Sequence, residues 1–121
     1  MLRCGPAMNE PLPAAKVADY NLVIDHQGTP VKIYEGSLNH IRKRHPEISD
    51  PLQFVTQILQ DPIVMTEDEL PNTIIYHRSA GKPLMHVAYV EVVKGLVKSA
   101  HITDTMKGGR VLWLKPTELL K

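Results

Sequence analysis

Short apolar segments separated by turns fill the C-terminal half of the chain. The segments 72–78, "NTIIYHR", and 83–93, "PLMHVAYVEVV", flank a short loop. The segment 95–104, "GLVKSAHITD", follows a tight turn, and "VLWL" at 111–114 follows the glycines of "KGG". β-Branched and aromatic residues between turn residues are typical of β-strands. Together with "IVMT" at 63–66, these segments predict an antiparallel meander.

Two helices are predicted before the meander. Ser37 is a suitable N-cap for a helix from Leu38 to about His45, and the proline that follows ends this helix. Asp50 is a suitable cap for a second helix that starts at Pro51. Apolar residues recur at helical spacing in this second helix and form one face, which consists of Leu52, Val55, Ile58 and Leu59.

Helices followed by an antiparallel meander predict the α+β class. The chain has 121 residues, which fits one domain with one core, predicted over residues 21–121. Residues 1–20 carry three prolines and little periodicity, and we expect them to form a flexible arm. Residues 21–36 predict a hairpin around Gly28.

Composition excludes several classes of protein. The net charge is +1, so a phosphate-binding surface would have to be a local patch. No apolar run approaches the roughly 20 residues of a membrane span, and the N-terminus has no apolar signal-peptide region. Cys4 is the only cysteine, so no internal disulfide can form, and a cytoplasmic location is expected.

Alternation along the strands predicts one polar face on the sheet. In segment 84–92, alternate residues are apolar except for His86, and we expect this set to face the helices. Val97 is expected on the opposite face of the sheet, away from the helices. His77 lies beside a loop and is expected to be solvated. The polar side chains expected to share that other face are Tyr89, Glu91, Ser99, His101 and Thr103. A rigid sheet is a suitable floor for a functional site.

The segment 37–48, "SLNHIRKRHPEI", concentrates basic groups. His40 and Arg44 are four residues apart and share a face of the predicted helix. His45 is predicted to be the last helical residue, where the helix dipole favours a protonated imidazole. Such a group can act as a general acid or bind phosphate. The structural alternatives are a solvated helix face and a histidine that only caps the helix.

These residue types suit RNA cleavage without a metal ion. The spacing of His40 and His45 matches no zinc motif, and neither a GxSxG motif nor a glycine-rich phosphate loop is present. RNA can be cut by its own 2′-hydroxyl when a protein supplies a base, an acid and groups that stabilise the phosphorane charge. Such groups occur at 40–45 and 86–107. We expect no metal and no cofactor.

Several of these segments resemble one known family. The run "HIRKRHPE", the joint "ILQDPIVM" and the segments "HVAYVEVV", "GLVKSAHITD" and "KGGRVLW" resemble the phage and bacterial PBECR-type domains of the barnase–EndoU–colicin–RelE-like nuclease group. The resemblance covers about residues 33–115. It implies an α+β fold with two or three N-terminal helices packed on a curved four- to five-stranded antiparallel sheet. It also implies metal-independent RNA cleavage, often by a toxin or an effector.

The family motifs carry over by position. The helix motif falls on His40, Arg44 and His45, and the strand motif T-A-Y-x-T falls on 99–103, where this chain has Ser99 and His101 in place of the threonine and the tyrosine. His45 and His101 are the predicted acid/base pair, with the two roles left unassigned. The predicted catalytic residues are His45, His101, Arg44, Thr103 and Tyr89, and the predicted substrate-binding residues are His40, Ser99 and Lys107.

The leading hypothesis is therefore an endoribonuclease-like domain of toxin or phage type that leaves 2′,3′-cyclic phosphate ends. Its expected partners are RNA, with tRNA as one candidate, and an immunity or antitoxin protein, with no membrane. One alternative is a catalytically inactive module on the same fold that binds RNA or protein. Another alternative is a structural protein that dimerises through an edge strand. The oligomeric state is open in all three hypotheses.

Overall fold

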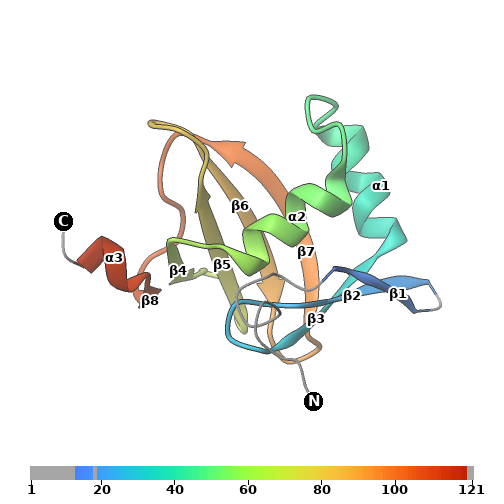
Figure 1. Cartoon of the computed structure of the whole chain (residues 1–121), viewed down its shortest axis with the longest axis horizontal. Helices are drawn as coiled ribbons and strands as arrows, with labels where there is room; N and C mark the ends of the chain where they lie inside the picture. The colour runs from blue at the N-terminus through green and yellow to red at the C-terminus, as the bar shows by residue number, and fades with distance from the viewer. Residues whose placement is uncertain (1–12, 18, 120–121) are drawn as a thin grey trace, which may run out of the picture.

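The computed structural model describes residues 13–17 and 19–119, which form a mixed eight-stranded sheet with two ten-residue helices on one face (Figure 1). The strands are β1 Ala15–Val17, β2 Tyr20–Ile24, β3 Pro30–Tyr34, β4 Val64–Glu67, β5 Thr73–Ser79, β6 Met85–Glu91, β7 Leu96–Thr103 and β8 Val111–Leu114. The helices are α1 Glu35–Arg44, α2 Pro51–Gln60 and the short α3 Pro116–Leu119. The strand order is β1-β2-β3-β7-β6-β5-β4-β8.

The fold class predicted from the sequence is wrong. Two or three N-terminal helices were expected on a four- to five-stranded antiparallel sheet, but three strands precede α1 and the sheet has eight strands. The sheet is mixed because β3 runs parallel to β7, with Lys32 paired to Leu96. The Lys32 N–H donates to the Gly95 carbonyl at 2.7 Å. Through this pairing, β1, β2 and β3 join the edge of the predicted meander. Local periodicity carries no signal for such long-range pairing.

The arm predicted over residues 1–20 falls mostly outside the described residues. Its part from Ala15 to Val17 is strand β1, which pairs antiparallel with β2. The hairpin predicted around Gly28 is confirmed, because β2 and β3 pair antiparallel across that turn. Asp25 holds the turn, since its Oδ1 accepts hydrogen bonds from the N–H groups of Gln27 and Thr29 at 2.9 and 2.8 Å.

The two main helices differ in how well the sequence predicted their starts. Asp50 caps α2 as expected, because its Oδ1 accepts from the Gln53 N–H at 3.2 Å and Pro51 is the first helical residue. In contrast, α1 begins at Glu35, and Ser37 lies inside the helix and donates to the Val97 carbonyl at 3.3 Å. The predicted Ser37 cap is therefore wrong. Across the described ranges, none of the helices has the length and apolar content to cross a membrane.

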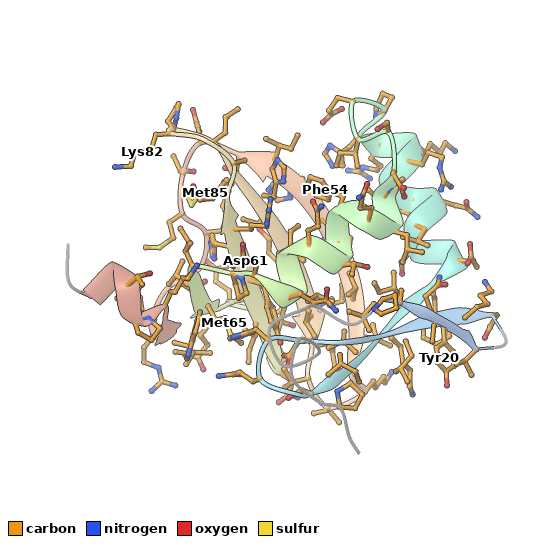
Figure 2. All side chains as sticks on the ribbon, in the orientation of Figure 1. Tyr20, Phe54, Asp61, Met65, Lys82 and Met85 are labelled. Carbon is orange, nitrogen blue, oxygen red and sulfur yellow. The ribbon has the colours of Figure 1, made fainter. Side chains whose placement is uncertain are left out.

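The hydrophobic core lies between the helices and one face of the sheet. α2 crosses β5 and β6, while α1 lies beside β7 (Figure 1). The buried core residues are Val23, Val31, Ile33, Leu38, Ile41, Ile48, Val55, Ile58, Leu59, Met65, Tyr76, Ala88, Val90, Val97 and Ala100. Side chains such as Phe54 and Met65 fill the layer from the helix and from the sheet (Figure 2). In this layer the Tyr76 hydroxyl donates to Asp25 Oδ2 at 2.6 Å.

A bulge in β7 corrects the predicted face of one residue. The register shifts so that Ser99 pairs with Tyr89 while Val97, not Lys98, pairs with Val90. Val97 therefore turns into the core, where it is fully buried, instead of lying on the polar face. The bulge leaves Ser99 and His101 on the face opposite the helices, where the alternation predicted them.

Candidate active site

The rings of His45, Tyr89 and His101 form a cluster on the face of the sheet that the helices leave uncovered. His101 on β7 and Tyr89 on β6 share this face, and their ring centroids are 5.6 Å apart with an interplanar angle of 25°. The ring centroid of His45 is 5.9 Å from that of His101, at 26°. The His101 ring thus lies between two rings that come from a helix end and a neighbouring strand. The structure brings the predicted acid/base pair together.

His45 reaches this cluster because α1 ends beside the later half of β7. β3 pairs with the start of β7, and α1 packs along the rest of that strand. His45 is the C-cap residue of α1, and its N–H donates to the Ile41 carbonyl at 2.8 Å. Its Nδ1 lies 3.4 Å from Glu47 Oε2, an ion pair when the imidazole is protonated. This contact directs Nδ1 of the ring towards the Glu47 carboxylate.

Electrostatics separate His101 from an ordinary surface histidine. Burial lowers the pKa of His101, and the charges of His45 and Lys107 lower this pKa further. A neutral imidazole at neutral pH can accept a proton. Burial raises the pKa of Tyr89, and the carboxylate of Asp68 raises it further, so the phenol keeps its proton. The cluster thus holds one acceptor and one hydroxyl donor side by side.

His77, which the sequence analysis placed in solvent, is fully buried on the same face, and the predicted exposure is wrong. The cause is the loop 104–110 between β7 and β8, which folds back over β4 and β5. The Lys107 N–H donates to His77 Nε2 at 2.9 Å, and Thr66 Oγ1 donates to the Lys107 carbonyl at 2.7 Å. No periodicity in the sequence signals this contact, because it joins a strand to a distant loop.

The His77 ring has a defined tautomer. Its Nε2 accepts a hydrogen bond, so in the neutral ring the proton is on Nδ1. Nδ1 is buried and has no partner in hydrogen-bond geometry. Burial lowers the pKa of His77, and the charge of His101 lowers it as well, against backbone groups of Val64, Ile75 and Lys107 that raise it. An unsatisfied buried N–H costs about 1–3 kcal/mol, and an apolar side chain would avoid that cost. We infer that the function of His77 is to offer its Nε2 as the acceptor for the Lys107 N–H.

The remaining predicted site residues lie at varied distances from the rings. Ser99 pairs with Tyr89 on the uncovered face. Thr103, at the end of β7, hydrogen-bonds the backbone of Thr105 and so shapes the start of the loop. Lys107 lies near enough for its charge to affect His101. Arg44 and His40 are exposed on α1 and make no hydrogen bond or ion pair within the described part of the chain, so the structure does not join them to the cluster.

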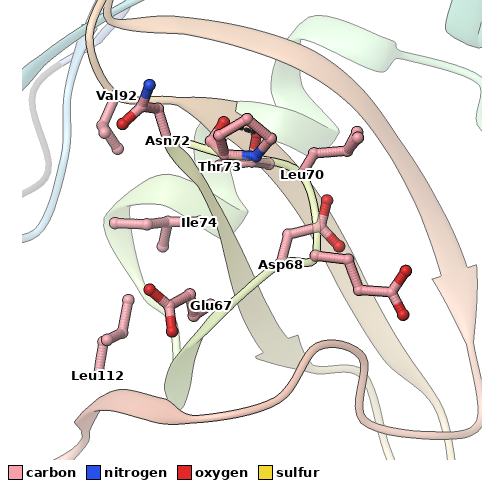
Figure 3. A pocket seen from close by; sticks show the side chains of 10 residues that line it. Glu67, Asp68, Leu70, Asn72, Thr73, Ile74, Val92 and Leu112 are labelled. Carbon is pink, nitrogen blue, oxygen red and sulfur yellow. Dashed lines mark hydrogen bonds between the residues drawn. The ribbon is translucent and has the colours of Figure 1, made fainter.

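Among the cavities lined by residues 13–17 and 19–119, two lie outside the cluster. One of about 500 Å³ is at the turn between β4 and β5 (Figure 3), with the carboxylates of Glu67, Asp68 and Glu69 on its wall. These carboxylates would repel a phosphate, so this cavity does not extend a phosphate site. The other, of about 320 Å³, lies on the helix side of the sheet and is lined by the α1–α2 loop, starting at Glu47, and by α2. Within residues 13–17 and 19–119, no three histidine, cysteine or acidic side chains gather closely enough to bind a metal ion.

Comparisons with known proteins give no relative. No family model matches the chain, and neither the curated proteins nor the solved structures contain a significant match. The side-chain geometry is therefore the basis for any statement about function.

Proposed function

We propose that this domain cleaves RNA by general acid–base catalysis, with His101 as the base and His45 as the acid. The observation that carries the proposal is the 5.9 Å separation of these two ring centroids, from residues far apart in the chain. An acid and a base this close can serve the two oxygens on either side of one phosphorus atom. The family resemblance of the "HIRKRHPE" run supports the same chemistry, with a cytoplasmic location as part of the proposal.

The surroundings of His101 suggest which histidine has which role. The lowered pKa of His101, caused by burial and then by the charges of His45 and Lys107, favours the neutral base. His45 is the other histidine of the pair, so the acid role falls to it. Its Nδ1 lies 3.4 Å from Glu47 Oε2, so Nε2 is the nitrogen left free to give a proton to the leaving oxygen.

The proposed reaction is an intramolecular transesterification. His101 takes the proton of a ribose 2′-hydroxyl while that oxygen forms a bond to the adjacent phosphorus. The bond from phosphorus to the 5′-oxygen of the next nucleotide breaks, and His45 gives its proton to that oxygen. The products end in a 2′,3′-cyclic phosphate and a 5′-hydroxyl.

In this proposal, Lys107 and Tyr89 stabilise the charge on the phosphate oxygens. The Lys107 backbone is held at both its N–H and its carbonyl, by His77 and by Thr66. We therefore assign His77 and Thr66 as positioning residues for Lys107. These hydrogen bonds hold the backbone from which the Lys107 side chain extends, which reduces the reorganisation needed to bring its charge to the phosphate.

Cleavage of total RNA in EDTA tests the proposal. The wild-type protein should leave 2′,3′-cyclic phosphate ends, and His101→Ala and His45→Ala should each reduce the rate about 10²- to 10⁴-fold. Gln27→Ala, at an exposed position in the β2–β3 turn, is the control and should cut like wild type. Folded His101→Ala and His45→Ala variants that cut RNA at the wild-type rate would refute the assignment.

A binding module without catalysis is the second candidate, and the exposed basic side chains of α1 favour it. Arg42, Lys43 and Arg44 follow one another in the last turn of this helix. Basic side chains at a helix end can bind phosphates whether or not a reaction follows. This function predicts that the logarithm of the association constant for RNA falls linearly with the logarithm of the salt concentration. It also predicts that the RNA stays intact.

A further inference from the structure

The cavity of about 320 Å³ lies between the α1–α2 loop, the first turns of α2 and the adjoining ends of β6 and β7. It is on the helix side of the sheet, and its volume is within the range of small-ligand pockets. Its wall includes Glu47, Gln53, Phe54, Gln57, His86 and Ile102. None of these residues except Glu47 has a role in the cluster of rings.

The wall combines two aromatic rings with two side-chain amides. The ring centroids of Phe54 and His86 are 4.4 Å apart, at an interplanar angle of 35°, and Phe54 lies between α2 and the sheet (Figure 2). Gln53 and Gln57 are one helical turn apart, so their amides share a face of α2. Neither amide makes a hydrogen bond to another described residue. Each amide therefore has a donor and an acceptor available to a ligand.

The charges of the wall restrict the ligand. The carboxylate of Asp50 on the wall would repel a phosphate or a carboxylate group of a ligand. Burial lowers the pKa of His86, and the charge of Arg78 lowers it further, so the ring adds no positive charge at neutral pH. A flat, neutral ligand that carries hydrogen-bond donors and acceptors on its edge fits these conditions. Unpaired nucleobases have these properties, and proteins that read single-stranded RNA stack such bases on aromatic rings.

The cavity is connected to the cluster of rings through two residues. Glu47 lines the cavity and also lies 3.4 Å from His45 Nδ1. Ile102 lines the cavity and directly follows His101 on β7, so the two side chains point to opposite faces of the sheet. An RNA strand with a phosphate at His45 and His101 would therefore have to pass around the end of α1, where Glu47 lies, to place a base in this cavity.

We propose that this cavity binds one unpaired nucleobase of the RNA, beside the phosphate that is cleaved. Glu47 and the two glutamines would accept hydrogen bonds from exocyclic amino groups, which favours bases that carry one. The inference rests on the proposed function for the position of the phosphate. The cavity itself can be tested without any cleavage.

The test is a titration of the full-length protein with the four free nucleosides, followed through the NMR signals of the Phe54 and His86 rings. We expect nucleosides with an exocyclic amino group to shift these signals. Gln57→Ala should weaken that binding about 5- to 150-fold, the range for loss of a base-edge contact, while Gln27→Ala should leave it unchanged. Gln57 is exposed and helical, so alanine there preserves the fold.

The outcomes separate this inference from the proposed function. If no nucleoside shifts the signals, or if Gln57→Ala binds like Gln27→Ala, the base site is wrong. It is also wrong if an arginine-containing peptide shifts the signals and no nucleoside does. Nucleoside binding by a protein that leaves all RNA intact would refute the nuclease and support the base site. RNA cleavage without nucleoside binding would support the nuclease and refute the base site.

Discussion

Replacement of Gly108 tests how the loop 104–110 is held on the sheet. Gly108 has a φ of +84°, and a Cβ built there would lie 2.4 Å from Thr66 Oγ1 and 2.9 Å from the Glu67 carbonyl oxygen. Thr66 Oγ1 is the group that hydrogen-bonds the Lys107 carbonyl. Gly108→Ala should therefore displace the loop and, with it, Lys107. Gly28 is a matched control, because its φ is +83° and nothing lies within 4 Å of the added carbon.

The expected magnitudes follow from these contacts. Alanine at a left-handed φ costs about 1–2 kcal/mol, and the smaller entropy of the unfolded chain offsets about 0.4–1 kcal/mol of that. Gly28→Ala should thus lower the free energy of unfolding by about 0–1.5 kcal/mol. Gly108→Ala adds about 1–3 kcal/mol for the steric conflict and about 1 kcal/mol for the hydrogen bond of Thr66. Its total should be about 2–5 kcal/mol.

Urea unfolding of the two variants and of the wild type measures this difference, and hydrogen exchange at the Lys107 amide reports the loop directly. Gly108→Ala should be at least about 1 kcal/mol less stable than Gly28→Ala and should lose protection at that amide. Equal stability of the two variants, with the Lys107 amide still protected in Gly108→Ala, would refute the close packing of the loop on β4.

Three further predictions concern titration and buried hydrogen bonds. If His101 is the base, the rate of RNA cleavage should rise with pH as a group with a pKa below the ordinary value of 6.5 loses its proton. A rise in rate governed by a pKa above 6.5 would contradict this role. Folding stability should fall as pH drops below 6.5, because the unfolded chain takes up a proton that the buried His77, with its lowered pKa, does not. Denaturant titrations from pH 5 to 8 should show a shallower pH dependence for His77→Gln, and an unchanged dependence would count against it. Tyr76→Phe should lower stability by about 1–3 kcal/mol in the same assay, because Asp25 Oδ2 loses its buried donor, and a change below about 0.5 kcal/mol would argue against this hydrogen bond.

Local signals in the sequence were sufficient for several elements and for part of the candidate site. Asp50 and Pro51 mark the start of α2, because capping and a fixed proline φ act within a few residues. Alternation in β6 and β7 correctly placed Tyr89, Ser99 and His101 on one face. The side-chain direction in a strand depends on position alone, so it can be read without knowledge of the partner strand.

Other features depend on contacts between distant segments. The bulge that turns Val97 into the core arises from the register between β6 and β7, and the alternation rule fails there. The parallel pairing of β3 with β7 enlarges the sheet to eight strands, although neither segment alone indicates a partner. His77 is buried because the loop 104–110 returns over its strand. Each of these outcomes depends on which surfaces meet when the chain collapses.

The sequence by itself determined the chemistry that this protein has available: the histidines, the basic helix end, the hydroxyl groups on the strands, and the helix and strand periods that orient them. Only the tertiary structure decided which of these groups meet. The ring of His45 lies 5.9 Å from that of His101 because α1 packs along β7 and ends there. The physical reason is that propensity and periodicity act over a few residues, whereas the packing of a hydrophobic core sets the distances between segments far apart in the chain.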